Sequence, residues 1–518
     1  MQSVESTCCV VSVLSSDTGE RLSCSGIIIR QAGVVICSGV LFGFLDKQYC
    51  FSSNQTFTLP YDTGRKLNIQ VEYHEPCVKM NECSGEPYAA SLLENPVSSH
   101  SAELLMMVNC PEFRSAIKSL FREADKWSLI EVEDSGMRNF DVLSWFAVLG
   151  VPQWKRDSVV PYMRSDALRK GRTVIACGSP FGSMCPDLFM STLSKGIVSN
   201  LFGEDNVVIL TDARCLPGTE GGGVFVKGQR HVYLVGLIVA PLCWRSNDWI
   251  GLSLACSFHV ILRNIRKSAV CSRELQESVR NISSNVSSKA DTDSLLEDPA
   301  IHSAVALVEV GHLWGSGVLY KHLVLTCRHV VDGKSVAKVK IHENGRFNTV
   351  TGQVVFSTEA TSPYDIAVIQ INTESPGTSI PRFASYFKPG EEVVVVGYGA
   401  FGSACGPSMS AGILSRVVSH RSQPVMLQTT CAVQAGASGG AVLRADTGEL
   451  LGIVSSNTRD FVAEVTYPHL NFSIPVTVLE PLLSLFTTTG DANVFEELNR
   501  VEEGVRTVWR LQNTQSRL

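Results

Sequence analysis

Residues 428–442 read QTTCAVQAGASGGAV, and residues 210–224 read LTDARCLPGTEGGGV. The two stretches align without a gap, and each ends in a Gly-rich turn. In one copy the turn carries Ser438, and in the other copy Glu220 takes that place. Glycine lets a chain turn tightly, so that neighbouring backbone N–H groups can point the same way. The pair indicates two copies of one fold with different chemistry at the turn.

Three more pairs of stretches follow the same order in the two halves, so the sequence contains an internal repeat. They are GSGVLYKHLVLTCRHV (315–330) with CSGIIIRQAGVVICSGV (24–40), VVVVGYGAFGSACG (393–406) with TVIACGSPFGSMCP (173–186), and ILSRVVS (413–419) with TLSKGIVS (192–199). The chain has 41 Gly and 21 Pro, mostly between short apolar runs, which favours an all-β fold.

The repeat divides the chain into domains. Residues 271–298 are rich in Ser, Asn and acidic residues and contain no aromatic residue, so we expect a linker there. We expect domains over 1–270 and 299–485, and a tail over 486–518. The first copy is longer, and we expect an insert around 73–125, before a strand at Trp127. The insert includes a helix predicted by PEFRSAIKSLFREADKW, residues 111–127.

Three residues of the second copy form a candidate catalytic triad. His329 follows an apolar strand in LVLTCRHVV, Asp365 precedes a strand in YDIAVIQI, and Ser438 lies in the Gly-rich turn. A base at a strand end is fixed but reachable, and a buried carboxylate can orient it. The order His, Asp, Ser is that of chymotrypsin. We expect the backbone N–H groups of Gly436 and Ser438 to form an oxyanion hole.

At this point the chain resembles known families. The DIAV block, the G-x-S-G-G loop and the following LGIVSS and NFSIPV resemble the HtrA/DegP branch of trypsin-like serine proteases, over about residues 300–485. Blocks in both halves, among them GSPFG, APLCW, TCRHV and YPHLNFSIP, resemble the family of peroxisomal leader-peptide-processing proteases. The resemblance implies tandem trypsin-like double β-barrel domains, the second active. It also implies a serine endopeptidase of the peroxisomal matrix that removes leader peptides from, or cuts, imported enzymes beside cysteine.

The resemblance also implies substrate-binding and self-cleavage residues. Ala432, six residues before Ser438, would lie at the base of the specificity pocket, where no acid awaits a basic side chain. The strand LGIVSSN would pair with extended substrate backbone, so Ile453, Val454 and Ser455 complete the predicted pocket. Cys110, in MMVNCPEF, lies in a stretch that resembles the family's self-cleavage region.

The first copy departs from the triad at every position. Ser38 or Gly39 falls where His329 should be, Lys126 aligns with Asp365, and Glu220 replaces Ser438. We therefore expect residues 1–270 to form a degenerate pseudo-protease copy that packs on the active one.

Composition and the chain ends limit the partners. The net charge of −6 argues against nucleic acid, and no apolar stretch is long enough to span a membrane. The start lacks a signal peptide, so the 17 cysteines are expected to be reduced thiols, without metal-ligand spacing or a cofactor. The last residues, Ser516, Arg517 and Leu518, are similar to the peroxisomal address S-K-L, which an import receptor reads.

Two other functions remain open from the sequence. One is a quality-control protease like the HtrA enzymes, and the other is a non-catalytic binding scaffold built from two trypsin-like folds. The oligomeric state is also open, with a homo-oligomer as one alternative.

Overall fold

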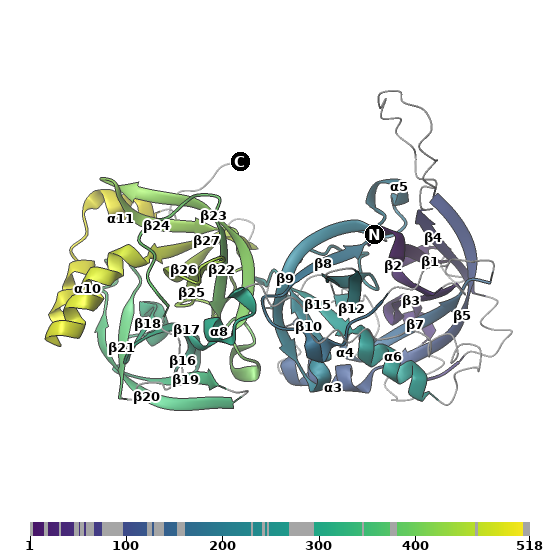
Figure 1. The fold of residues 1–518 in the computed structure, drawn as a ribbon, viewed down its shortest axis with the longest axis horizontal. Coiled ribbons are helices and arrows are strands. Elements are labelled where there is room, and N and C mark those ends of the chain that lie inside the picture. The colour runs from purple at the N-terminus through teal and green to yellow at the C-terminus, as the bar shows by residue number, and fades with distance from the viewer. Residues whose placement is uncertain are drawn as a thin grey trace, which may run out of the picture.

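Closed β-barrels of six strands make up most of the structure, two in each half of the chain (Figure 1). The computed structural model describes residues 4–14, 19–30, 33–45, 51, 56–58, 67–74, 97–121, 127–128, 139–152, 161–228, 231–240, 244–245, 248–268, 295–343, 346–372, 381–460 and 465–510. The predicted all-β fold with tandem trypsin-like double barrels is confirmed.

In the order of the chain, helix α6 (Phe258–Lys267) follows the barrels of the first half. Helix α3 (Pro111–Leu120) comes earlier, in the connection between two strands of the first barrel. The first barrel has strands β1 (Cys8–Leu14), β2 (Arg21–Arg30), β3 (Val34–Ser38), β4 (Asn68–His74), β5 (Val97–Asn109) and β7 (Trp145–Gly150). The second barrel has β8 (Thr173–Gly178), β9 (Thr192–Phe202), β10 (Val208–Thr211), β11 (Gly223–Lys227), β12 (Val232–Ala240) and β15 (Ser253–Ser257).

The second half repeats this arrangement and adds helices at its end. Its first barrel has β16 (Val305–Val310), β17 (Leu313–Tyr320), β18 (Leu323–Thr326), β19 (Val336–Glu343), β20 (Arg346–Ser357) and β21 (Ala367–Ile371). Its second barrel has β22 (Glu392–Gly397), β23 (Ser408–His420), β24 (Gln423–Thr429), β25 (Ala441–Arg444), β26 (Leu450–Asp460) and β27 (Val465–Pro475). The helices are α8 (Pro299–Ser303), α9 (Arg328–Val331), α10 (Val476–Thr489) and α11 (Glu503–Trp509).

Alternating side chains explain why these runs form barrel strands. In β22, Val394 and Val396 enter one apolar cluster, while Val393 and Val395 enter another on the opposite face. Successive side chains of a strand point to opposite faces, so a fully apolar run fits a sheet that is buried on both sides. The same Val-rich composition disfavours a helix at this place.

The predicted insert around 73–125 is wrong in its bounds. Strand β5 lies inside that range and is a regular member of the first barrel. The strand that corresponds to β21 is β7, and Trp127 belongs to a short strand β6 (Trp127–Ser128) that pairs with β13 (Trp244–Arg245). The extra residues of the first half are thus divided among several connections. One of these connections contains α3, which is the helix predicted over 111–127.

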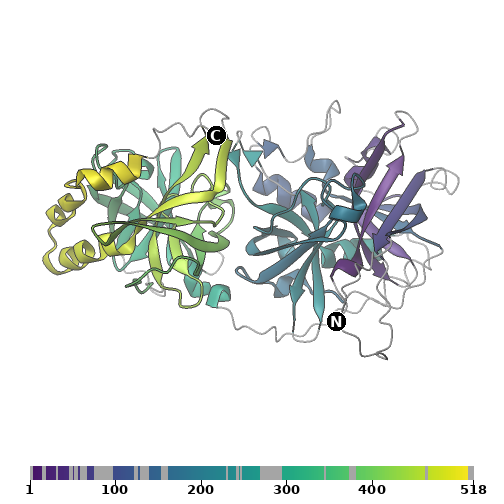
Figure 2. The same ribbon diagram turned by 90° about the horizontal axis from the view of Figure 1, so that it is seen from above.

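The predicted boundary at residue 485 is also wrong, because it falls inside α10. The helices α10 and α11 pack on the second half at its end remote from the first half (Figures 1 and 2). Apolar side chains such as Leu483, Phe486 and Val505 extend the core of that half. Residues 271–294 of the predicted linker, and 511–518 with the targeting tripeptide, lie outside the described residues. Among the described residues, no helix is long and apolar enough to cross a membrane.

The two halves meet through equivalent strands. Strand β9 of the first half lies beside β23 of the second (Figure 1). These are the strands of the repeated TLSKGIVS and ILSRVVS blocks. The buried carboxylate of Asp212 bridges them, because it accepts hydrogen bonds from the N–H groups of Ile197 (2.7 Å) and Ala411 (2.6 Å). Buried hydrogen bonds as well as packing therefore join the two halves at this pair of strands.

Candidate active site

The structure brings His329 and Asp365 together at the ends of paired strands. Strands β18 and β21 pair with Thr326 opposite Ala367, so the residues just beyond them meet. The Nδ1 atom of His329 lies 2.5 Å from Oδ2 of Asp365, and the His329 N–H donates to Oδ1 at 3.1 Å. This double contact fixes both the imidazole plane and the nitrogen that faces the carboxylate, and it leaves Nε2 for chemistry.

The environment of Asp365 favours its charged form. Burial acts to raise the pKa of this carboxyl group, but the hydrogen bonds from His329 and the charges of His329 and Arg328 outweigh it. The pKa therefore lies below its ordinary value of 3.8. The Nε atom of Arg328 is 3.7 Å from Oδ1. The carboxylate is thus ready to stabilise a protonated imidazole.

Ser438 lies on the turn that the repeat predicted, in the second barrel. Gly436 (φ 90°) and Gly439 (φ 84°) adopt backbone conformations that favour glycine, and they shape the turn. The hydroxyl of Ser438 donates to the Ser455 carbonyl oxygen at 3.3 Å in this structure. The Val454 carbonyl accepts bonds from both Gly439 N–H (2.7 Å) and the Cys327 thiol (3.2 Å), which holds the serine turn beside the histidine segment.

The N–H groups of Gly436 and Ser438 make no hydrogen bond with other described residues, so they are available to an oxyanion. One serine supports the turn behind them. Ser316 Oγ accepts from Tyr398 N–H (2.7 Å) and donates to the Gly436 carbonyl (2.9 Å). Ser316 was not among the residues predicted from the sequence. The signal was present, since a serine occupies this place in both repeated blocks, as Ser25 and Ser316.

The predicted substrate-pocket residues divide into two groups. The side chains of Ile453 and Val454 lie in the barrel core, so they do not line a pocket. Ser455 contacts Ser438, as described, and Ala432 is buried, with its carbonyl accepting a bond from Ser410 Oγ at 2.7 Å. A Cβ atom on Gly251 of the first half would lie 3.0 Å from Ala432 Cβ, so the two halves are in contact at this point.

The same hydrogen bonds identify Glu220 as the counterpart of Ser438. The N–H of Ser25 donates to the Glu220 carbonyl at 2.9 Å, as that of Ser316 does to the Ser438 carbonyl at 2.8 Å. Ser25 Oγ donates to the Gly218 carbonyl at 2.8 Å, which matches the bond from Ser316 to Gly436. The predicted degenerate copy therefore has the backbone of a protease turn with an acid on it.

The Glu220 carboxylate fills the degenerate oxyanion hole. Its Oε2 atom accepts from the Gly218 N–H at 2.7 Å, the group that corresponds to Gly436 N–H. Burial raises the pKa of Glu220, and the bonds from its own N–H and from Gly218 N–H oppose the rise. A side chain thus occupies the place where, in the second half, the N–H groups of Gly436 and Ser438 have no partner among the described residues.

Two predicted counterparts in the first half are wrong. Strand pairing aligns Cys37 with Thr326 and Ala147 with Ala367. His329 is three residues after Thr326, so Val40, three residues after Cys37, stands at its position, not Ser38 or Gly39. Trp145 stands at the Asp365 position, not Lys126, which lies outside the described residues. Lys126 was predicted at this position because the strand at Trp127 was matched with β21, whereas β7 is the equivalent strand.

Cys110 is fully buried in the first half. It precedes α3, and its sulfur lies 3.9 Å from that of Cys256 and accepts from Asn264 Nδ2 at 3.5 Å. Its N–H donates to the Ser144 carbonyl at 2.9 Å, and its own carbonyl accepts from Arg114 N–H at 3.0 Å. The peptide groups around Cys110 are therefore engaged in the folded chain.

One group of side chains in the described residues could in principle hold a metal ion. Donor atoms of Cys327, His329 and Asp365 lie within 4.8 Å of one another. Burial, and then the charge of Asp365, raise the pKa of the Cys327 thiol well above 9.0, so the thiolate that a metal needs is disfavoured. His329 and Asp365 are bonded to each other. The arrangement suits a catalytic triad better than a metal site.

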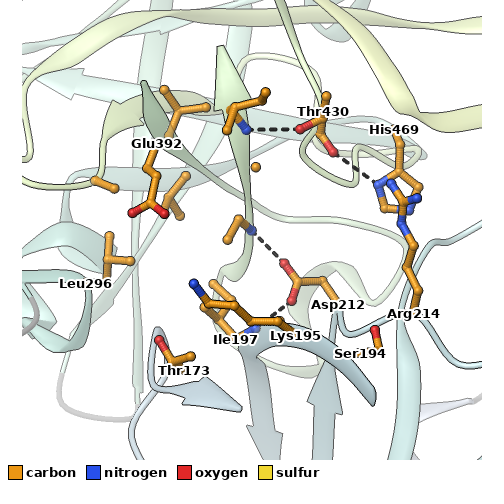
Figure 3. A pocket seen from close by; sticks show the side chains of 17 residues that line it. Thr173, Ser194, Lys195, Ile197, Asp212, Arg214, Leu296, Glu392, Thr430 and His469 are labelled. Carbon is orange, nitrogen blue, oxygen red and sulfur yellow. Dashed lines mark hydrogen bonds between the residues drawn. The ribbon is translucent and has the colours of Figure 1, made fainter. Parts of the chain in front are cut away.

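Cavities lined by described residues also lie outside the serine turn, and two of them concern this site and the contact between the halves. One of about 360 Å³ adjoins Asp365 and Ser455, and Arg328, Arg506 and Arg510 give it a basic lining. The other, of about 380 Å³, lies between the halves (Figure 3). Asp212 is at its centre, near Lys195 and Arg214. Burial raises the pKa of Asp212 to about 6, although the bonds from Ile197 and Ala411 oppose the rise.

Comparisons with known proteins agree with this geometry. A family model described as a trypsin-like peptidase domain matches residues 311–453. The peroxisomal leader peptide-processing protease of Mus musculus is 41% identical over 99% of this chain and 97% of its own, and that of Homo sapiens is 38% identical over the same shares. The serine protease Do-like HtrA of Bacillus subtilis is 29% identical over 34% of this chain and 40% of its own.

Proposed function

Because the chain belongs to the family of peroxisomal leader peptide-processing proteases, we propose that it cuts peptide bonds with the triad His329, Asp365 and Ser438. The family membership confirms the predicted trypsin-like serine-protease class and the peroxisomal location. The proposed triad rests on the pair of bonds between His329 and Asp365, beside a serine turn with two N–H groups that no other described residue binds.

The proposed reaction passes through an acyl-enzyme. Ser438 Oγ turns from the Ser455 carbonyl and attacks the substrate carbonyl carbon, while His329 Nε2 takes the hydroxyl proton. Asp365 stabilises the resulting imidazolium, and the N–H groups of Gly436 and Ser438 bind the oxyanion. The bond to the leaving amine breaks as His329 returns the proton. Water then hydrolyses the ester by the same steps in reverse.

The structure supports a limited proposal about substrates. Ala432 offers no counter-charge, so we propose a small or apolar residue before the cut, cysteine included. The outer part of β26 would pair with extended substrate backbone, as in other strand-addition sites. The natural substrates proposed are imported peroxisomal precursors that carry N-terminal leader peptides, by analogy with the names of the relatives.

Self-cleavage near Cys110 is part of the proposal, with a condition. A protease binds an extended segment, but Cys110 is buried and hydrogen-bonded on both sides. We propose that a cut there occurs on chains in which α3 has locally opened or has not yet folded. The intact fold then protects the site.

The proposed partners are the precursor substrates, the import receptor through Ser516, Arg517 and Leu518, and further copies of the chain in a homo-oligomer. A quality-control protease and a non-catalytic scaffold remain the alternatives. The open oxyanion site of the second half and the plugged one of the first favour catalysis by a single site over a scaffold.

Incubation with a peroxisomal precursor that carries a leader peptide tests the proposal. N-terminal sequencing of the product should show one new terminus beside a cysteine, and Ser438→Ala should give none. Cleavage at many sites in unfolded chains would favour quality control. Equal cleavage by wild type and Ser438→Ala would contradict the proposed triad.

A further inference from the structure

A loop of the second half is buried in the apolar core of the first half. Ala400, Phe401 and Cys405 belong to the same buried cluster as the residues around α3. The Phe401 ring lies edge-on to Phe121, with ring centres 5.5 Å apart at 79°, and Phe121 stacks on Phe140. Only 6% of Phe401 is exposed. The first half thus provides the environment that buries this side chain.

Polar bonds from the first half hold the other end of the loop. The side-chain amide of Asn200, which is fully buried, donates to the Gly406 carbonyl at 2.9 Å and lies 2.9 Å from Ser408 Oγ. Lys170 Nζ donates to the Pro407 carbonyl at 2.7 Å. Buried polar groups are costly to leave unpaired, so these bonds fix where the loop lies.

The opposite side of the loop supports the oxyanion hole. The Ala400 N–H donates to Gln434 Oε1 at 3.3 Å, and the Gln434 carbonyl accepts from Ala437 N–H at 3.0 Å. A Cβ atom on Gly436 would lie 2.7 Å from the Tyr398 carbonyl oxygen, so the Gly436 backbone rests directly on the loop. A shift of the loop therefore displaces the N–H donors at Gly436 and Ser438.

The equivalent loop of the first half provides a comparison. Phe181 occupies the place of Phe401 in the repeated GSPFG and GYGAFG blocks, but it is 43% exposed. It also has φ 60°, whereas Phe401 has φ −83°. The first-half loop reaches its phenylalanine one residue earlier, because Phe181 is three residues and Phe401 four residues beyond the glycines that end the equivalent strands β8 and β22. The barrel fold alone therefore does not bury a phenylalanine at this place, and for Phe401 the covering surface comes from Phe121 of the first half.

We propose that the first half positions the oxyanion hole of the second, and that Phe401 is the positioning residue through which it acts. The inference rests on the proposed function. Oxyanion donors must be placed accurately, because removing one costs roughly 10²–10³-fold in kcat. A loop released from Phe121 would leave Gly436 with support from one side only. The degenerate copy would then be retained as part of the catalytic apparatus.

Replacing Phe401 by Ala in the full chain tests the proposal. We expect kcat to fall by roughly 10- to 100-fold, less than the loss of a whole donor, while KM stays within about twofold. Affinity for a peptide boronic acid, whose adduct uses the oxyanion hole, should fall in parallel with kcat. The matched control is Phe181→Ala, which removes the same ring from the equivalent loop and should leave all three quantities unchanged.

Two more variants separate positioning from a loss of folding. Phe401→Leu should recover most of kcat, and Phe121→Ala should reproduce the kcat loss from the other side of the contact. The double variant Phe121→Ala/Phe401→Ala should lose no more than either single one, because both remove one contact. If Phe401→Ala does not fold, as judged by circular dichroism, Phe401→Leu and Phe121→Ala decide the question.

Wild-type kcat in a folded Phe401→Ala, or in Phe121→Ala, would overturn the inference. So would a rise in KM alone with unchanged boronic acid affinity. The proposed function has a separate signature: if it is wrong, the wild type itself fails to react with a fluorophosphonate, whatever residue stands at 401.

Discussion

At the residue scale, Asp365 carries the clearest prediction. Asp365→Asn removes the charge that stabilises the imidazolium and disturbs the tautomer of His329, so we expect kcat to fall by roughly 10³–10⁴-fold. KM should change little, because Asp365 lies behind the histidine. Steady-state kinetics measures both. Asp446→Asn, at an exposed position, is the control. A loss below tenfold would contradict the proposed role.

Glu220 carries a second prediction at this scale. Glu220→Ser places a serine on the turn of the first half, and a Ser438→Ala background removes the one of the second half. We expect no peptide hydrolysis by this double variant. Val40 and Trp145 stand where a base and its carboxylate would be needed, and Trp145 is held by a bond from Nε1 to the Phe51 carbonyl at 2.9 Å. Peptide hydrolysis above that of Ser438→Ala alone would show that the first half is not degenerate.

The residues of the proposed triad could be selected from the sequence because each lies near a strand with a clear apolar pattern. The sequence also predicted that Glu220 replaces the serine. It could not predict that the carboxylate folds back onto Gly218 N–H, since that depends on the φ of 95° at Gly218 and on side-chain placement.

At the element scale, Asp212 links β9 to β23 and makes their contact sensitive to pH. Its folded-state pKa is raised to about 6 from 3.8, so the protonated form is favoured on folding. The stability this group contributes is present below its ordinary pKa and is lost as the pH rises through about 6. A tenfold change in proton affinity corresponds to about 1.4 kcal/mol. Between pH 4 and pH 7 the wild type should therefore lose roughly 2–3 kcal/mol of unfolding free energy relative to Asp212→Asn, which does not titrate.

Urea denaturation of both proteins at the two pH values measures this difference. The shared titrations cancel in the comparison, which leaves Asp212. Parallel stability curves for wild type and Asp212→Asn would contradict the raised pKa.

Strands were easier to predict than their connections. The runs TVIACG and EVVVVG alternate between two faces of the sheet, and both form strands, as the predicted all-β fold requires. The connection between β5 and β7 contains an amphipathic helix and a second apolar stretch. In the sequence, the strand at Trp127 therefore resembles the first-half counterpart of β21. Only the hydrogen-bond register shows that β7 holds that place.

At the scale of the whole molecule, the two halves are predicted to depend on each other. Removal of residues 1–270 exposes Phe401 and its neighbours and leaves the loop of residues 398–407 without its anchors. We expect the isolated second half to be insoluble or misfolded. Solubility and activity after expression measure this, with the full chain as control. A soluble, fully active fragment of residues 299–518 would contradict the dependence.

The repeated blocks predicted tandem domains that pack on each other, but not which surfaces meet. The motif FGS occurs in both copies, and one phenylalanine is buried in the partner half while the other is exposed. The loop that carries Phe401 is one residue longer after its strand than the loop that carries Phe181. The surface that buries Phe401 comes from α3 and Phe121, far away in the sequence.

We expect one of the two trypsin-like halves to be active, with Ser438 as its nucleophile. Labelling of the full chain with a fluorophosphonate, followed by peptide mapping in a mass spectrometer, tests it most directly. We predict a single adduct on Ser438 in the wild type, its strong reduction in Asp365→Asn and its absence in Ser438→Ala. An adduct on another residue that persists in Ser438→Ala, or no adduct on the folded wild type, would contradict the claim.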